Sequence, residues 1–209
     1  RKDLGSDGLR VAVDEGVLTM HIRDVGREET VEIDTPNALV SLLEPGEYTI
    51  EAWVAPGNVA QEDARIVSYS GGSATRNFML GQTLYSYDFY NRASTTNQAG
   101  DPKLTTSDDD EDLQATLQHV VATYDPVNGR RIYVNGVSTG DTDARGGGTL
   151  SDGDDSFALV FGNETSSNRQ WKGVMRLVAI HSRALTGTQI RQNFDAGVGE
   201  RYFMLFNVS

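Results

Sequence analysis

The feature that most constrains the fold is a series of short runs in which β-branched and aromatic residues alternate with other residues, separated by clusters of Gly, Pro, Asn and Asp. Successive side chains of a strand point to opposite faces, so each run indicates a strand of a sheet with two distinguishable faces. The runs are 18–23, 48–54, 65–69, 77–82, 84–90, 119–124, 130–134, 157–161, 174–180 and 202–208. This number of short strands predicts an all-β fold, an antiparallel β-sandwich.

The residues between the runs predict how the strands connect. Segment 125–129 reads Asp-Pro-Val-Asn-Gly, in which the proline presets one backbone angle and Gly129 supplies a positive φ. Asn135-Gly136 is the two-residue hairpin pattern. Both segments therefore predict tight turns between neighbouring antiparallel strands.

One short helix is expected on the C-terminal side of the sequence. Thr186 is a favourable cap for residues 187–195, and Gly197 ends the segment. Ile190 and Phe194 are four residues apart and share one helix face, which we expect to pack on the sandwich.

Length and charge exclude several classes of protein. The 209 residues suit one β-sandwich, and we expect 1–209 to form a single domain. With 18 basic and 30 acidic residues the net charge is -12, which repels nucleic acid, so no nucleic acid partner is expected. The apolar stretches, such as 173–180, fall short of the roughly 18 residues that a membrane span needs, and no membrane insertion is expected. The absence of cysteine excludes disulfides and thiolate chemistry.

Three segments, taken in order, carry a resemblance to a known family. They are YTIEAWVAP at 48–56, LQHVVATYDPVNGRRIYVNGV at 117–137 and WKGVMRLVAIHSRALTGTQI at 171–190. Together they resemble the laminin G-like members of the concanavalin A-like lectin and glucanase superfamily. The resemblance implies a jelly roll of two curved antiparallel sheets. Because this fold hosts lectins, hydrolases, lyases and spacers, it leaves the function open.

A second resemblance concerns the cellular context. FGNETSSNRQWKG at 161–173, followed by LVAIHSRAL at 177–185, is similar to laminin G-like modules appended to large exported bacterial proteins. The sequence also starts at Arg1 rather than Met. We therefore expect a module excised from a larger polypeptide that is periplasmic, cell-surface or secreted, with other domains of that polypeptide among its partners.

The acidic residues give little indication of catalysis. Glycan hydrolysis needs two carboxylates that face one cleft. Glu51, Asp88 and Glu164 are the candidates on or beside strands, and no two of them have the spacing that places them side by side. We interpret Glu51 as a buried acid paired with an arginine. His21, His119 and His181 lie on separate predicted strands, so no local zinc motif is present.

Calcium is the one metal that the sequence suggests. Pentraxin-like relatives bind it at places that read Thr75-Arg76-Asn77 and Asn163-Glu164 here, and Arg76 would repel calcium and pair with Glu164. In many bacterial relatives an Asp occupies the place of Arg176. The remaining hypothesis is one structural calcium in the acidic loops, either at 101–112 or at Asp152, Asp154 and Asp155. Acidic loops of this composition are also typical of plain solvated segments.

A sugar-binding face is predicted on the strand 84–92. Alternation places Tyr85, Tyr87 and Phe89 in the core, and it exposes Ser86, Asp88, Tyr90 and Arg92 on the other face. An exposed ring beside planar polar groups suits a sugar, although a charged edge strand has the same pattern. The full predicted ligand-binding set is Arg76, Asn77, Asp88, Tyr90, Arg92, Asn163, Glu164, Arg169 and Trp171.

These observations predict a noncatalytic carbohydrate-binding or adhesion module with a glycan or polysaccharide as its partner. One alternative is a structural or protein-interaction spacer. A second alternative is a polysaccharide hydrolase or lyase of the same fold.

Overall fold

The computed structural model describes backbone and side chains in residues 46–107, 112–143, 146–150, 153–154 and 156–198. Before residue 46 it describes the backbone of five strands. These are β1 (Asp3–Gly5), β2 (Gly8–Ala12), β3 (Met20–His21), β4 (Thr30–Asp34) and β5 (Ala38–Val40). Strands β1, β2 and β4 form a small sheet of three strands.

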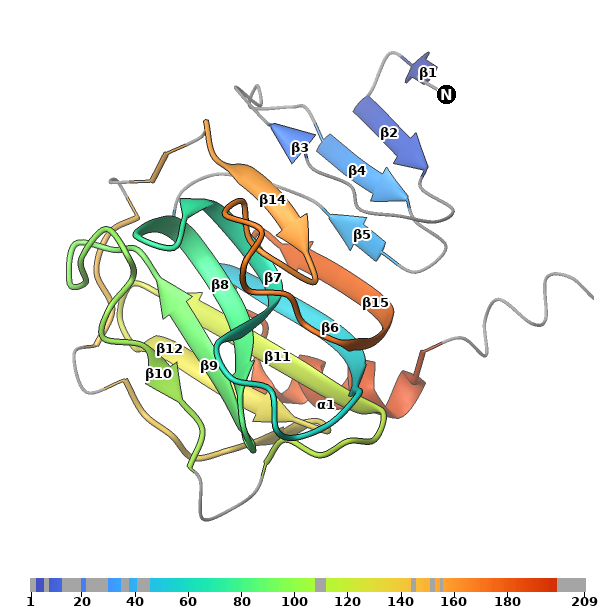
Figure 1. Cartoon of the computed structure of the whole chain (residues 1–209), viewed down its shortest axis with the longest axis vertical. Helices are drawn as coiled ribbons and strands as arrows, with labels where there is room; N and C mark the ends of the chain where they lie inside the picture. The colour runs from blue at the N-terminus through green and yellow to red at the C-terminus, as the bar shows by residue number, and fades with distance from the viewer. Residues whose placement is uncertain are drawn as a thin grey trace, which may run out of the picture.

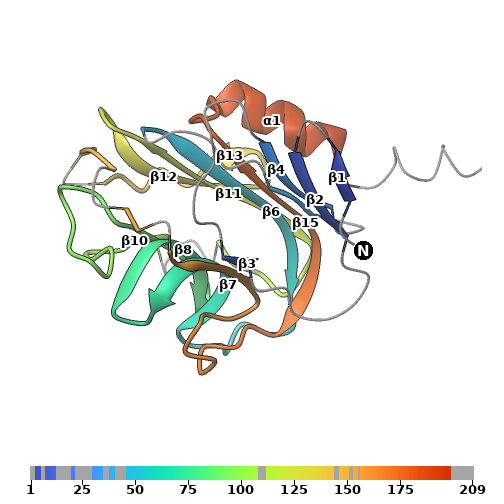
Figure 2. The same cartoon turned by 90° about the horizontal axis from the view of Figure 1, so that it is seen from above.

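Two larger sheets are stacked in a sandwich (Figures 1 and 2). Sheet I has the order β10 (Leu104–Thr105), β9 (Ser86–Asn91), β8 (Thr75–Thr83), β7 (Ala64–Gly72), β14 (Ala158–Phe161) and β3. Sheet II has the order β13 (Val137–Ser138), β12 (Gly129–Val134), β11 (Gln118–Asp125), β6 (Tyr48–Pro56), β15 (Gly173–His181) and β5. The neighbouring strands are antiparallel except for β15 and β5. The predicted antiparallel jelly roll sandwich is confirmed.

The core lies between the two sheets and follows the alternation of the strands. Ile50, Ala52 and Val54 of β6 are fully buried, and they share one apolar cluster with Tyr87 and Phe89 of β9. The predicted core positions of both aromatic residues are therefore confirmed.

Tyr85 departs from its predicted place in the core. It is exposed, because β9 begins only at Ser86 and Tyr85 belongs to the turn that follows β8. The preceding Leu84 has a φ of 54°, a turn conformation that ends the alternation there.

The predicted strands between 48 and 180 correspond to β6, β7, β8, β9, β11, β12, β14 and β15. Segment 18–23 overlaps β3, and segment 202–208 lies outside the described residues. Gly129 has a φ of 75°, and Asn135 and Gly136 have φ values of 52° and 76°, so both predicted turns are confirmed. The expectation of one domain over 1–209 stays a prediction.

The helix α1 (Gly187–Ala196) covers the outer face of sheet II (Figure 2). Thr186 and Gln189 form a capping box at its start, and Gly197 follows its end with a φ of 68°. Ile190 packs with Val121 and Tyr133 of the sheet beneath. The predicted helix is confirmed, and within the described residues no helix is long and apolar enough to cross a membrane.

Candidate functional site

The candidate site is the outer face of sheet I, which points away from sheet II. In β9, Asp88 and Tyr90 alternate with the core residues Tyr87 and Phe89, so they lie on this outer face. Asp88 is opposite Gly81 of β8, and Gly81 is opposite Arg65 of β7. The register therefore forms a row of polar residues across the middle of the sheet.

Two irregularities of the strands bring arginines to the outer face. Between the pairs Arg65–Gly81 and Val67–Leu80, β7 has one extra residue, and the alternation changes phase there. Between the pairs Tyr69–Phe78 and Ser70–Arg76, the extra residue is in β8. Without these bulges, the alternation of β7 and β8 would place the side chains of Arg65 and Arg76 on the core face of the sheet.

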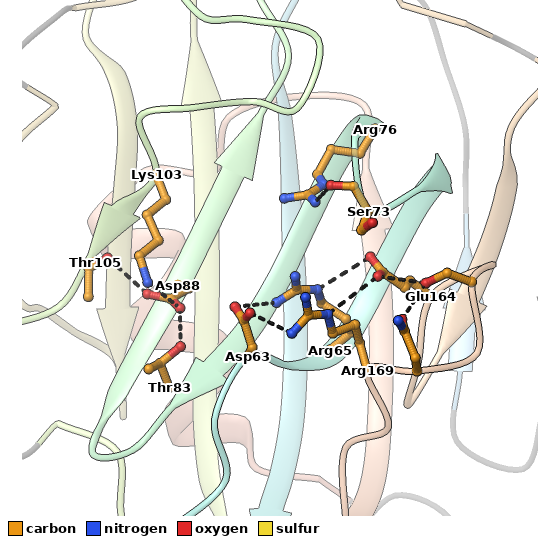
Figure 3. A network of polar contacts seen from close by, with 12 residues as sticks. Asp63, Arg65, Ser73, Arg76, Thr83, Asp88, Lys103, Thr105, Glu164 and Arg169 are labelled. Atoms are coloured by element: carbon orange, nitrogen blue, oxygen red, sulfur yellow. Dashed lines mark hydrogen bonds and ion pairs between the residues drawn. The ribbon is translucent and has the colours of Figure 1, made fainter.

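Asp88 is fully buried and surrounded by donors. Its carboxylate accepts hydrogen bonds from the hydroxyls of Thr83 at 2.6 Å and Thr105 at 2.8 Å, and from Lys103 Nζ at 2.8 Å (Figure 3). The prediction that Asp88 is exposed is wrong, because β10 and its neighbour Lys103 cover the strand at this place. A role of Asp88 in binding a ligand directly stays a prediction.

The ring of Tyr90 is surrounded by three cations. The guanidinium carbon of Arg76 lies 4.5 Å from the ring centroid, that of Arg65 5.8 Å, and Lys103 Nζ 6.0 Å. Tyr90 is only 8% exposed, and its burial raises the pKa of the hydroxyl. The prediction of an open aromatic platform is wrong, since Arg76 already occupies a place over the ring.

Glu164 and Asp63 join two arginines into one network (Figure 3). Glu164 is buried, with its carboxylate 3.5 Å from Arg65 Nε and 3.8 Å from Arg169 Nε. Asp63 contacts the same two arginines, at 3.3 Å and 2.6 Å. The predicted pairing of Glu164 with Arg76 is wrong, because Arg65 and Arg169 occupy the carboxylate.

Arg76 is 3% exposed and differs from the other arginines of this face. Its Nη2 donates to the carbonyl oxygen of Ser73, and its Nε is buried without a hydrogen-bond partner. Among the residues for which the structure gives side chains, no carboxylate forms an ion pair with it.

The rim of this face is open to solvent. The side chains of Asp63, Arg169 and Lys103 are 42%, 35% and 32% exposed. We call these three residues the rim. They lie around a buried floor that Arg65, Arg76 and Tyr90 form. The rim residues Asp63 and Lys103, and Arg65 of the floor, are absent from the predicted ligand set.

The remaining predicted ligand residues lie near this face or beneath it. Asn77 forms two hydrogen bonds with the backbone of Asp154, at 2.7 Å and 2.9 Å, and the backbone NH of Arg92 donates to the carbonyl of Asn77. The side chain of Asn163 accepts from the NH groups of Glu164 and Arg169. Trp171 is buried in the core and donates to Gln82 at 2.9 Å, so its predicted role in binding a ligand is wrong.

The residues that would replace the pentraxin calcium ligands do not fit two calcium ions. The carboxylate of Glu164 forms ion pairs with Arg65 and Arg169, so it is not free to bind calcium. The side-chain amide of Asn77 is hydrogen-bonded to the backbone of Asp154. Among the residues whose side chains are described, no three or more acidic or histidine residues lie close enough together to bind a metal ion.

Of the acidic residues that remain as candidate calcium ligands, the structure describes only some. Asp152 and Asp155 lie outside the described residues, as do residues 108–111. Asp154 is half-buried and accepts hydrogen bonds from the hydroxyl and NH of Ser156, which lower the pKa of its carboxyl group.

Glu51 lies on the opposite side of the sandwich, between sheet II and α1. Its carboxylate is 2.8 Å from His119 Nε2 and 2.9 Å from His181 Nε2, and it also accepts from Asn193 of α1 at 2.9 Å. The predicted burial is confirmed. The predicted arginine partner is wrong, because two histidines that are 62 positions apart in sequence meet at this carboxylate.

Glu51 therefore lies apart from the other two candidate catalytic acids. Glu51 faces α1 on sheet II, whereas Asp88 and Glu164 belong to sheet I and its loops. Cations or hydroxyls hold both carboxylates of sheet I. This arrangement differs from the facing pair that glycoside hydrolysis uses.

A jelly roll with a polar cluster on the outer face of one sheet and a helix on the other has the architecture of a lectin-like fold. A family model described as the concanavalin A-like lectin/glucanases superfamily, of the laminin G type, matches residues 27–191. The chain belongs to this family. A comparison with curated proteins finds no match.

Solved structures of the same fold include toxin and pentraxin domains. The chain is similar to the binding domain of botulinum neurotoxin DC in complex with rat synaptotagmin II, with 16% identity and a TM-score of 0.51, over 72% of this chain and 36% of that one. It is similar to the native heptameric SAP-like pentraxin from Limulus polyphemus, with 16% identity and a TM-score of 0.51, over 70% of this chain and 69% of that one. At these identities the likeness shows the fold alone.

A third similar structure is botulinum neurotoxin type C, which depends upon interaction with two ganglioside molecules to enter cells. The identity is 14% and the TM-score 0.51, over 72% of this chain and 36% of that one. The chain thus spans about a third of the toxin structures that it matches.

Proposed function

We propose that this domain is a noncatalytic carbohydrate-binding or adhesion module that binds its glycan on the outer face of sheet I. The observation that carries the proposal is the open rim of Asp63, Arg169 and Lys103 around the buried floor of Tyr90 and two arginines. Sugars offer paired hydroxyls, which carboxylate and guanidinium groups bind in fixed directions. The hydrogen bonds among these residues hold the rim in place before a ligand arrives.

The similar structures support a binding role. Their descriptions name a receptor-binding toxin domain, a pentraxin and a toxin that interacts with gangliosides. The separation of Glu51 from Asp88 and Glu164 favours binding over hydrolysis. A protein partner is the second candidate, because one similar toxin domain is in complex with rat synaptotagmin II.

Binding to a panel of alginate, laminarin, xylan and chitin oligosaccharides tests the proposal. We expect calorimetry to detect binding of at least one, with no release of reducing ends or unsaturated products. Arg169→Gln should weaken that binding by about fivefold or more, since it removes a charged donor from the rim. Arg191→Gln, which changes an arginine on α1 beyond the opposite sheet, is the matched control and should have no effect.

Three outcomes contradict this proposal in different ways. If the domain cleaves an oligosaccharide, and Glu51→Gln or Glu164→Gln abolishes that cleavage, the domain is an enzyme. Glycan binding that Arg169→Gln leaves unchanged would place the site elsewhere. A domain that binds no glycan and instead binds a protein would favour the second candidate.

Export as part of a larger bacterial polypeptide and one structural calcium at Asp152, Asp154 and Asp155 belong to the same proposal. The likeness of 161–185 to modules of exported proteins supports the first. Calcium would stabilise the native state by mass action. If melting temperature is unchanged by EDTA and by added calcium, calcium has no part in this domain.

A further inference from the structure

Arg76 carries a buried positive charge that pairs with no carboxylate among the described side chains. It is 3% exposed, its Nε has no hydrogen-bond partner in the described part of the chain, and its Nη2 donates to the neutral carbonyl oxygen of Ser73. Figure 3 shows its guanidinium bonded to Ser73, apart from the carboxylates that hold Arg65 and Arg169. Buried charges in proteins are ordinarily paired or bound to an ion.

The carboxylates described near Arg76 form ion pairs with other cations. Four cations, Arg65, Arg76, Lys103 and Arg169, lie on this face, and the ion pairs of the described residues involve the carboxylates of Asp63, Asp88 and Glu164. Lys103 pairs with Asp88, while Arg65 and Arg169 share Asp63 and Glu164. Of these four cations, the arginine over the ring of Tyr90 is the one that forms no ion pair with a described carboxylate.

The electrostatic environment of Arg76 is unfavourable for its charge. Burial lowers the pKa of the Arg76 guanidinium, and the neighbouring charge of Arg65 lowers it further. Glu164, Tyr90 and Asp101 oppose this effect from outside the distance of an ion pair. The ring of Tyr90 gives partial compensation, because a cation over an aromatic face is stabilised.

We propose that Arg76 binds an oxyanion, namely a carboxylate or sulfate group carried by the glycan, so that this module selects acidic sugars. The inference rests on the proposed glycan-binding function. A guanidinium forms strong charge-assisted hydrogen bonds with both kinds of anion. The ligand anion supplies the ion-pair partner that the described carboxylates do not give Arg76, and Ser73, to whose carbonyl oxygen Arg76 donates, is exposed.

A purely structural role of Arg76 predicts the opposite effect on stability. If Arg76 serves only to hold the turn at Ser73, Arg76→Met should lower the melting temperature. If Arg76 is kept for a ligand, Arg76→Met should raise the melting temperature of the free protein, because an apolar side chain of similar length removes a buried charge that the ring of Tyr90 compensates only in part.

The test uses glucose, glucuronate and glucose 6-sulfate as matched probes, followed by NMR at the arginine Nε–Hε signals of the whole chain. We expect the Arg76 signal to shift with glucuronate, glucose 6-sulfate or both, and to stay unchanged with glucose. Arg76→Met should weaken the binding of the acidic sugar by about tenfold or more, as loss of a charged hydrogen-bond partner does. The two acidic probes separate carboxylate from sulfate recognition.

Two variants serve as controls. Arg65→Met removes a paired arginine and should lower the melting temperature. Asp63 and Glu164 would each lose one of their two ion pairs and keep the one with Arg169. Arg191→Met changes an exposed arginine of α1 and should alter neither melting nor binding. The titration of the unmodified protein gives the answer even if a variant fails to fold.

Each result decides between the two proposals. Equal binding of glucose and glucuronate with an unshifted Arg76 signal would overturn this inference and leave the glycan module intact. Lower stability of Arg76→Met, with unchanged binding of glucuronate, would make Arg76 structural. If none of the three sugars shifts any signal and the polysaccharide panel is also negative, both proposals fail.

Discussion

The carboxylate of Glu51 stays ionised inside the protein because three side chains donate hydrogen bonds to it. Burial by itself would raise the pKa of Glu51. The hydrogen bonds from His119 and His181, together with the electrostatic interactions with these two side chains, outweigh burial and lower the pKa from 4.5 to about 2. Because the carboxylate is an acceptor, each imidazole holds its proton on Nε2 in this arrangement.

This pKa difference predicts a pH dependence of stability. A carboxyl group whose pKa is lower in the folded state stabilises the protein above its unfolded pKa, and the stabilisation is lost as the pH falls through the folded pKa. The difference between 4.5 and about 2 corresponds to roughly 3 kcal/mol at neutral pH. We expect Glu51→Gln to lower the free energy of unfolding by that order at pH 7, and the gap to the unmodified protein to shrink between pH 4.5 and 2.

Urea unfolding at several pH values measures this gap. Glu47→Gln is the matched control, because Glu47 is exposed four residues earlier. A gap that stays constant from pH 7 to pH 2.5 would contradict the assigned role of Glu51.

At the residue scale, the sequence predicted the segments that form the site, but it predicted wrong partners for Glu51 and Glu164. Alternation correctly placed Tyr87 and Phe89 in the core. It could not identify Arg65 as a site residue, because the bulge beside it changes which face the following residues take. The burial of Tyr90 depends on Arg76 and Lys103, which come from two other segments, and a pattern within one strand contains no information about them.

At the scale of elements, the turn between β12 and β13 is packed against α1. Gly136 has a φ of 76°, and a Cβ atom there would lie 2.9 Å from Phe194 Cβ and 3.1 Å from Arg191 Cδ. Phe194 in turn stacks on Trp53 of β6, with ring centroids 5.7 Å apart. The glycine thus allows the helix to approach sheet II closely.

Gly136→Ala should therefore destabilise the protein through both its backbone conformation and the contact with α1. We expect a loss of about 2 to 4 kcal/mol, of which about 1 kcal/mol comes from the positive φ. Gly140→Ala isolates the backbone effect, because Gly140 has a φ of 81° and nothing within 4 Å of the added Cβ. Thermal melts compare the two variants, and equal losses would mean that the contact with α1 is unimportant.

The elements with strong local patterns were predictable. Strands such as β6 and β11 have long alternating runs, and α1 has a capping box and a terminal glycine. The two-residue strands β10 and β13 were missed, because tertiary pairing alone defines strands of this length. The cover that β10 provides over Asp88 was missed for the same reason.

At the scale of the whole molecule, the two outer faces of the sandwich differ. The helix α1 covers sheet II (Figure 2). Asn193 of α1 donates to Glu51, and Phe194 stacks on Trp53 and His119. The outer face of sheet I instead has a network of charged residues (Figure 3). Arg65, Arg76 and Tyr90 form its buried floor, and the rim is partly exposed. This difference is why we assign binding to sheet I.

The most direct measurement of this assignment is an amide chemical-shift map of the whole chain, recorded with the tightest-binding oligosaccharide of the panel. The account predicts that the largest shifts come from β7, β8 and β9, together with the segments around Asp63, Lys103 and Arg169. Shifts confined to α1 and the strands of sheet II would contradict it.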